Sequence, residues 1–262
     1  MNLPASAALQ FRSIFVLMLQ RIRTRFVGSR AGYIWAIIEP ICWIFVLKMA
    51  FSSHAGQQSP LGGSFEVFFA IGVVLARMWK TTAGSVEPIV TRTHKSGLPT
   101  LHKLDSAYAT WLLEIVTAIV VLIVILSSLQ AFGFDAVPAD PLTCLLVIGV
   151  TAVYSLSYAL AFALAINLAP GLVHFKSIIM LIMFMTSGFA TLVDRMPPQL
   201  RDILLWNPMV HCIEWFREGF YAGYECASLD RGYLFAVTIC FLLLGLAGER
   251  ALRRRPPARG MR

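Results

Sequence analysis

Six stretches of mostly apolar residues alternate with short polar segments along the chain. They cover residues 31–51, 65–86, 107–129, 142–168, 177–193 and 233–249, and the fifth of them is short. A helix needs about 20 apolar residues to cross the hydrocarbon core of a bilayer. Clusters of Gly and Pro separate several of the stretches, as expected at helix ends. The pattern therefore predicts an all-α integral membrane protein with six transmembrane helices.

The segment before the first stretch differs, because its apolar residues recur at helical spacing. Within residues 9–27 they lie on one face of a helix: Phe11, Ile14, Phe15, Met18, Leu19, Ile22 and Phe26. The arginines follow the apolar run of this segment, whereas a signal peptide carries its positive charge before such a run. We therefore expect an N-terminal amphipathic helix that lies at the membrane interface, with a packed core helix as the alternative.

Residues 194–230 combine signals that stop and start helices. Pro197 and Pro198 stop the fifth stretch, and Asn207 followed by Pro208 is typical of a helix start. A helix from there to Gly223 is too short to cross a bilayer, which takes about 20 residues, so we expect an outer re-entrant or interfacial helix between spans five and six. One face is apolar, with Trp206, Met209, Ile213, Phe216 and Phe220, and the other polar, with His211, Glu214, Glu218 and Tyr221, while Arg217 lies near the boundary.

Metal or redox chemistry finds little support in the sequence. His211 and Glu214 have the spacing of half a metal site, but no second ligand pair is visible, and a hydrogen-bonded helix face is the alternative. The five cysteines form no C-x-x-C pair. A disulfide between Cys212 and Cys226 stays open, because both lie in the segment expected outside the membrane. No metal and no cofactor are expected on this chain.

Composition and charge agree with a membrane protein. The chain is 58% hydrophobic and 14% charged, with a formal net charge of +8, and soluble domains are only about 45–50% apolar. The basic residues cluster at the chain ends and in one short loop beside apolar stretches, which favours an anionic membrane surface over nucleic acid as their partner.

The distribution of basic residues also predicts orientation. Most of them fall on one side if both termini and the loops at 87–106 and 169–176 lie together, which places both termini in the cytosol. The chain then divides into a cytosolic interface helix (1–30), a six-span transmembrane domain (31–249) and a basic cytosolic tail (250–262). The loop at 87–106 is cytosolic, and the re-entrant segment at 194–230 is periplasmic.

Charged residues inside the spans need partners, because an unpaired charge in hydrocarbon costs at least about 2.5–3.5 kcal/mol. If the first two spans form an antiparallel hairpin, one register pairs Glu39 with Arg77 and Lys48 with Glu66. The same register places Lys80 level with Trp35, and Glu114 of the third span lies at a similar depth. We therefore expect both acid–base pairs. Alternatively, Arg77 and Lys80 line a wet path and meet an anionic substrate.

Several catalytic signatures are absent from the sequence. It contains no G-x-x-x-x-G-K-[ST] phosphate loop, no G-x-S-x-G elbow and no H-E-x-x-H. The chain is therefore not expected to be an enzyme. The energy for any transport must come from an electrochemical gradient or from a separate subunit.

Two motifs carry a resemblance to a known family. The sequence RTRFVGSRAGYIWAIIEP, which ends at Pro40, and NPMVHCIEWFREGFYAGYE at 207–225 resemble segments of the permease subunits of bacterial ABC exporters of capsular polysaccharide. GLPTLHKLD at 97–105 is a looser match to the loop after their second span. With the six-span layout, the resemblance covers nearly the whole chain.

The resemblance implies a homodimer in the bacterial inner membrane, coupled to two ATPase subunits that bind ATP and Mg. It further implies a lipid-linked capsular glycan as substrate, with a periplasmic co-polymerase-type adaptor and an outer-membrane polysaccharide channel as partners. By the same resemblance, the N-terminal helix and the 87–106 loop would contact the ATPases. The candidate coupling residues are Arg21, Arg25, Arg92, His94, Lys95, His102 and Lys103.

A sliding glycan is held weakly by aromatic rings and a few charges. The candidate lining consists of Tyr33, Trp35, Trp79 and Trp111 with Arg77 and Lys80, and Arg30 is the candidate contact for an anionic lipid phosphate. An aromatic belt at the membrane interface is the alternative for the rings. Export of O-antigen, teichoic acid or small lipophilic compounds is a second possibility, and a gradient-driven carrier is a third. No internal repeat supports the carrier.

Overall fold

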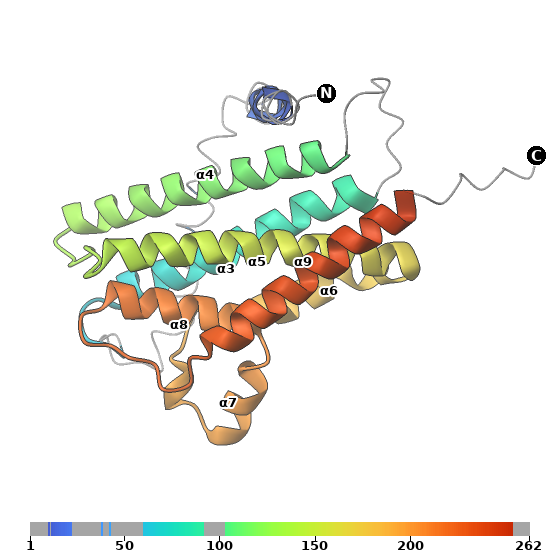
Figure 1. Cartoon of the computed structure of the whole chain (residues 1–262). Helices are drawn as coiled ribbons and strands as arrows, with labels where there is room; N and C mark the ends of the chain where they lie inside the picture. Colours follow the sequence, from blue (N-terminus) through green and yellow to red (C-terminus); the bar gives the residue numbers. More distant parts are fainter. Residues whose placement is uncertain are drawn as a thin grey trace, which may run out of the picture.

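The computed structural model describes residues 60–91 and 103–253 without a break, residues 12–22 near the N-terminus, and positions 10, 38 and 42. Helices dominate these residues (Figure 1). In chain order they are α3 (Phe65–Thr91), α4 (Lys103–Ala131), α5 (Pro141–Leu168), α6 (Leu172–Met185), the 3-10 helix η1 (Val193–Arg195), α7 (Pro198–Leu204), α8 (Pro208–Phe220) and α9 (Arg231–Arg253). The expected all-α class is therefore confirmed.

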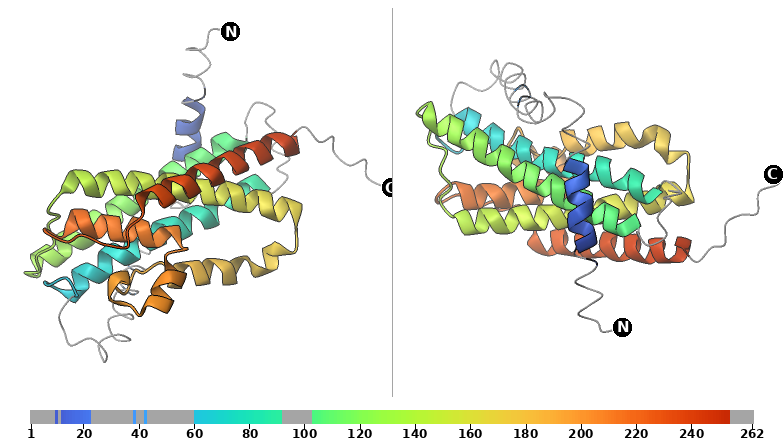
Figure 2. Two further views of the ribbon diagram at one scale, coloured as in Figure 1. Left: turned by 60° about the horizontal axis from the view of Figure 1, so that its bottom comes forward. Right: turned by 90° about the horizontal axis from the view of Figure 1, so that it is seen from above.

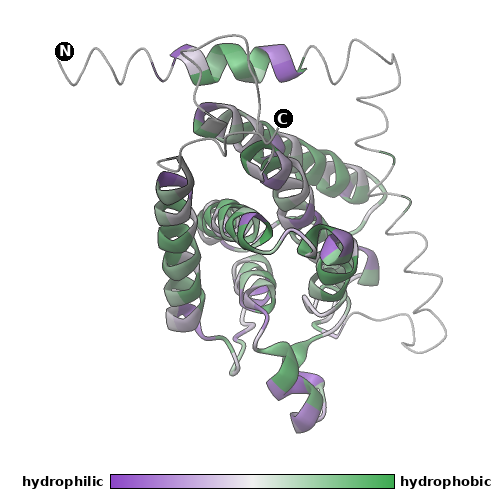
Figure 3. Ribbon diagram, turned by 90° about the vertical axis from the view of Figure 1, so that its right-hand side faces the viewer, coloured by the Kyte–Doolittle hydropathy of each residue, from purple (hydrophilic) through white to green (hydrophobic). Residues whose placement is uncertain are grey.

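Four of these helices are long and apolar enough to cross a membrane: α3, α4, α5 and α9. The most apolar window of α3 is 78% buried and that of α5 61%, whereas those of α4 and α9 are only 28% and 22% buried. Helices α3 and α5 therefore form the centre of the bundle. Apolar residues also cover its outside, as expected for a surface that faces lipid or another protein (Figure 3).

The remaining two predicted spans are not established. The first, at 31–51, lies outside the described residues apart from positions 38 and 42. The fifth differs from the prediction at 177–193, because α6 begins at Leu172 and ends at Met185. Its 14 residues rise about 21 Å, less than the hydrocarbon thickness of about 30 Å. The helix ends because Thr186 and Ser187 bond back to its last turn and Gly188 takes a φ of 75°.

Helices α5 and α9 come into close contact at two glycines of α9. A Cβ atom placed on Gly245 of α9 would lie 2.4 Å from the Cβ of Leu160 on α5, and one on Gly248 would lie 2.5 Å from the methyl carbons of Leu164. At these two glycines the backbone of α9 therefore packs directly against the leucines of α5, as small residues allow between membrane helices.

The N-terminal segment 12–22 is helical and crosses the start of α4 (Figure 2, right). Arg21 donates a 2.8 Å hydrogen bond from Nη2 to the hydroxyl of Ser106. Phe15, Val16 and Leu19 stay 48–54% exposed. Exposed apolar residues fit a helix at the membrane surface, and this location stays a prediction.

Candidate functional site

Helix α8 begins and ends where the sequence indicates. The side chain of Asn207 caps it by accepting a 3.0 Å hydrogen bond from the backbone N–H of Met209, and Pro208 occupies the first turn. The chain leaves the helix at Tyr221. Gly223 then adopts a φ of 75°, which favours glycine.

Burial of α8 differs from the amphipathic prediction. Nearly every residue from Pro208 to Phe220 is buried, including the polar face, whereas Trp206 is 78% exposed although the pattern placed it on the apolar face. The polar face is buried because the linker after α6 and the loop before α9 pack over it and supply hydrogen-bonding partners.

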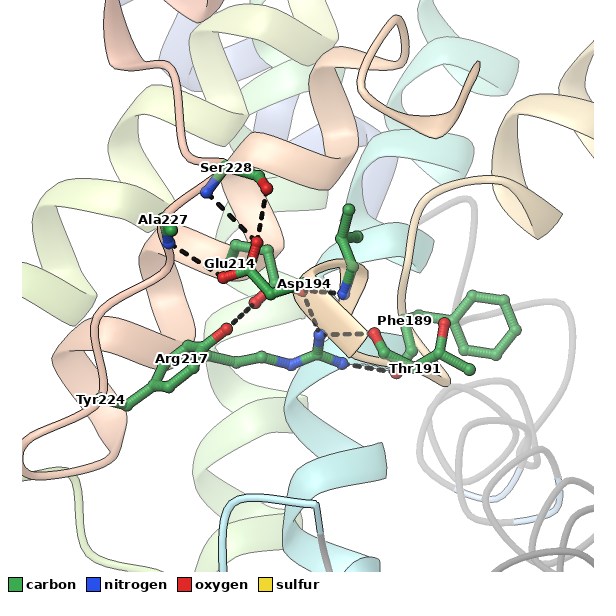
Figure 4. A network of polar contacts seen from close by, with 9 residues as sticks. Phe189, Thr191, Asp194, Glu214, Arg217, Tyr224, Ala227 and Ser228 are labelled. Carbon is green, nitrogen blue, oxygen red and sulfur yellow. Dashed lines mark hydrogen bonds and ion pairs between the residues drawn. The ribbon is translucent and has the colours of Figure 1, made fainter. Parts of the chain in front are cut away.

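The central contact of this polar face is an ion pair within α8. Nη1 of Arg217 lies 2.9 Å from Oε1 of Glu214, and the two side chains are 0% and 2% exposed. The guanidinium also donates to the carbonyls of Thr191 and Phe189, at 3.0 and 2.9 Å (Figure 4). Its carbon lies 4.0 Å from the ring centroid of Phe68 on α3. Arg217 therefore fastens α8 to α3 and to the linker after α6.

Glu214 accepts further hydrogen bonds from both sides of α8. The backbone N–H of Val193 donates to Oε1 at 3.3 Å, and the hydroxyl of Tyr224 donates to Oε2 at 2.8 Å. A buried carboxylate is tolerated only when paired and hydrogen-bonded in this way. The pair thus ties the linker, α8 and the loop before α9 into one unit.

Asp194 makes a second connection between the linker and that loop. It accepts hydrogen bonds from the backbone N–H groups of Ala227 and Ser228, at 2.9 and 3.2 Å, and from the Ser228 hydroxyl at 2.5 Å (Figure 4). Partial burial opposes ionisation of Asp194, but these hydrogen bonds outweigh it and lower the pKa below the usual aspartate value.

Glu218 and His211 complete the polar face. Glu218 accepts from the backbone N–H of Cys226 at 3.1 Å and from Arg231 at 2.5 Å. Nδ1 of His211 accepts from the N–H of Asp230 at 3.1 Å, so its Nε2–H donates to the carbonyl of Leu205 at 3.0 Å. Both imidazole nitrogens are therefore engaged by the backbone, which matches the hydrogen-bonded helix face rather than half a metal site. In the described ranges, no cluster of three or more potential metal ligands occurs.

The cysteines of this region carry free thiols. Cys212 lies buried within α8, and Cys226 is buried in the loop before α9. The two do not form a disulfide in the structure.

The charged and aromatic candidates of α3 and α4 are placed as follows. Trp79 is fully buried, with its ring edge-on to Tyr158 of α5 at 5.1 Å, so it packs between α3 and α5. Trp111 donates from Nε1 to the carbonyl of Ala152 at 2.8 Å. Lys80 is half-buried, and its ammonium lies 5.0 Å from the ring centroid of Phe184 on α6.

The two predicted acid–base pairs each have one member outside the described residues. Arg77 is half-buried on α3, and Glu66 lies in the first turn of α3, but Glu39 and Lys48 are not among the residues described. Glu114 is buried and accepts a 3.1 Å hydrogen bond from the hydroxyl of Ser85. The remaining candidates also lie outside the described residues, namely Arg25, Arg30, Tyr33, Trp35, Arg92, His94, Lys95, His102 and the side chain of Lys103.

The sequence analysis did not predict one ion pair. The ammonium of Lys176 on α6 contacts the carboxylate of Glu87 on α3. The sequence pattern assigned Glu87 to a polar loop, whereas α3 continues through Pro88 to Thr91. Helical spacing from the preceding span, carried on past Val86, is the signal that could have indicated it.

Comparison with known proteins gives one consistent result. Residues 13–221 match the sequence profile of the family described as ABC-2 type transporter. The chain is 27% identical over 250 residues to the capsule polysaccharide export inner-membrane protein CtrC of Neisseria meningitidis serogroup B, covering 92% of this chain and 91% of that protein. It is 24% identical over 246 residues to the capsule polysaccharide export inner-membrane protein BexB of Haemophilus influenzae, again covering 92% and 91%. It is 27% identical over 236 residues to the polysialic acid transport protein KpsM of Escherichia coli, covering 90% and 91%.

Proposed function

Because the chain belongs to the ABC-2 type transporter family, we propose that it is the channel-forming permease subunit of an ATP-driven exporter of lipid-linked capsular polysaccharide. Family membership confirms the resemblance that the motifs near Pro40 and Asn207 indicated. The observation that carries the proposal is the similarity to CtrC, BexB and KpsM, which spans at least 90% of this chain and 91% of each relative.

The energy source is a separate protein. The sequence lacks a phosphate loop, so ATP and Mg bind two partner ATPase subunits rather than this chain. These subunits dock on the N-terminal helix and on the connection between α3 and α4. The hydrogen bond between Arg21 and Ser106 supports this arrangement, because it holds the N-terminal helix beside the start of α4.

Two copies of the chain enclose the path of the polysaccharide. The apolar outer surfaces of α4, α6 and α9 leave room for a second copy as well as lipid. A long glycan cannot be occluded in a pocket, so ATP-driven closure of the partner subunits opens and ratchets a continuous passage. Arg77 and Lys80, both half-buried on α3, supply the weak cationic contacts to an anionic substrate.

The location is the bacterial inner membrane, with both termini in the cytosol. The helix α8 and its cover, residues 186–230, then lie on the periplasmic side. Residues 186–230 are densely hydrogen-bonded and form a rigid unit, which we name the platform. A periplasmic adaptor and an outer-membrane polysaccharide channel continue the route from there.

Genetic replacement tests the proposal. Deleting the gene in the source bacterium should abolish surface polysaccharide, leave lipid-linked polysaccharide in the cytosol, and be reversed by a plasmid copy. A companion strain that lacks ATP hydrolysis in the partner ATPase should show the same accumulation. Normal surface polysaccharide in the deletion strain would contradict the assignment, and loss of O-antigen, teichoic acid or drug export instead would identify another substrate.

A further inference from the structure

Helix α6 is the least embedded of the apolar helices in the described part of the chain. Only Met180 and Phe184 of its residues are buried. Its exposed residues are mostly apolar: beside His174 and Ser177 they are Val173, Phe175, Ile178, Leu181, Ile182 and Met185. Helix α6 therefore meets the rest of the described bundle along one narrow line.

That line is an antiparallel contact with α3, which we name the α3–α6 seam and define by three pairs. Lys176 contacts Glu87, Met180 faces Gly84, and Phe184 faces Lys80. The α6 members are spaced one helical turn apart, so they lie on one face of that helix. A Cβ atom on Gly84 would lie 3.9 Å from Cε of Met180, which is ordinary contact.

The two ends of α6 are held differently. At its C-terminal end, the side-chain amide of Asn207 donates to the carbonyl of Met183 at 2.8 Å and to the hydroxyl of Thr186 at 3.0 Å. In the linker after α6, the carbonyl of Phe189 accepts a hydrogen bond from Arg217. At its N-terminal end, the described contact with α3 is the ion pair of Lys176 and Glu87. The platform thus anchors one end, whereas the other end is joined to α5 by residues 169–171 and contacts α3 through this ion pair.

Opening this charged contact leaves Glu87 with a second partner. The Lys176 side chain is 21% exposed and the Glu87 side chain 5% exposed. The hydroxyl of Thr91, at the end of α3, donates to the Glu87 carboxylate at 2.7 Å, and this hydrogen bond lies within α3, so it stays when the helices part. The pair of Arg217 and Glu214 differs, because both its members are hydrogen-bonded to other segments, Arg217 to the linker after α6 and Glu214 to that linker and to the loop before α9. The pair of Arg217 and Glu214 therefore stays closed, whereas the pair of Lys176 and Glu87 can open.

We propose that Glu87 and Lys176 are positioning residues that latch α6 to α3, and that the α3–α6 seam opens at this end in every transport cycle while α6 pivots on residues 186–188. Glu87 lies one turn from the end of α3 at Thr91, on the side where the partner ATPases act. Movement of this end of α3 breaks or remakes the latch. This inference rests on the proposed function.

Charge exchange tests the latch. In proteoliposomes that contain the complete complex, Glu87→Gln and Lys176→Gln should each lower the polysaccharide exported per ATP hydrolysed by about tenfold, within the usual range of coupling between sites. Lys176→Arg should export as wild type. The double exchange Glu87→Lys with Lys176→Glu should recover most of the loss, because it restores the pair. Unchanged export per ATP in both single variants would overturn the proposal. The proposal would also be overturned if neither the double exchange nor Lys176→Arg supported export in complexes of normal thermal stability.

Cross-linking tests the opening. Cysteines placed at Gly84 and Met180, in a chain without its five native cysteines, can be joined by a short cleavable bis-thiol reagent. Joining them should stop export while ATP hydrolysis continues, and cleavage should restore export. The matched control Gly84→Ala with Met180→Cys, treated with the same reagent, should export normally. Full export by the joined complex would show that the seam need not open. Failure of the untreated wild type to export would instead overturn the proposed function, and this inference with it.

Discussion

Arg217 and Glu214 form an ion pair with 2.9 Å between Nη1 and Oε1, and both side chains are withdrawn from solvent. They stand one turn apart on α8, yet the groups that satisfy them come from outside this helix: the carbonyls of Phe189 and Thr191 and the hydroxyl of Tyr224. The pair therefore joins segments that are distant in sequence. Its removal should affect the whole platform and not only α8.

Replacing Arg217 by Met should destabilise the protein by about 3–5 kcal/mol, because Glu214 would be left as a buried, uncompensated charge. Thermal unfolding of the purified protein in detergent measures the effect. Adding Glu214→Gln to Arg217→Met should recover part of the loss. Equal melting temperatures of wild type and Arg217→Met would contradict the role assigned to this pair.

Gly245→Ala should destabilise the bundle by about 1–3 kcal/mol, because the added methyl group would overlap Leu160 of α5. Gly149→Ala is the matched control, since a Cβ atom there meets nothing within 4 Å. Thermal melting of both variants checks the difference. A Gly245→Ala protein as stable as the control would show that α5 and α9 are not in close contact.

Asp194 should make stability depend on pH at the acidic end. Its pKa is lowered in the folded protein, so the carboxylate stabilises the fold above the unfolded value of about 3.9, and this contribution is lost as pH falls through the folded pKa. Wild type should therefore lose stability between pH 5 and acid conditions (about pH 3) faster than Asp194→Asn. Parallel stability curves for the two proteins would exclude this contribution.

Arg77→Ala and Glu39→Gln should each lower polysaccharide export, and the double variant should be no worse than the poorer single one if the two residues pair. Export and the amount of folded protein are measured together, because loss of folding would also reduce export. Unchanged surface polysaccharide in both single variants would remove any functional role for this pair.

Helix positions were predictable wherever apolar residues ran for a full span or the local sequence contained a helix-capping residue. The start of α3 at Phe65, the end of α5 at Leu168 and the start of α8 after Asn207 all follow the sequence pattern. The end of α6 was predicted wrongly, because apolar residues resume at Phe189 and continue to Val193 after the chain has turned at Gly188. Hydropathy alone cannot distinguish an apolar linker from an apolar helix.

The candidate site was predictable only in part. The i, i+3 spacing of Glu214 and Arg217 indicates that they can meet on α8. Their loop partners have no periodicity, so neither the carbonyl of Phe189 nor the backbone N–H of Val193 could be foreseen. The latch between Glu87 and Lys176 depends on how α6 packs on α3, and sequence spacing carries no information on that.

Export into proteoliposomes tests the central claim most directly. The purified complex of this chain with its ATPase is reconstituted with lipid-linked polysaccharide, and transfer of the polymer across the bilayer is followed with ATP, without ATP, and with a proton gradient alone. Transfer with ATP only, lost on chelation of Mg, is the predicted result. Transfer driven by the proton gradient without ATP, or full activity of this chain without an ATPase subunit, would contradict it.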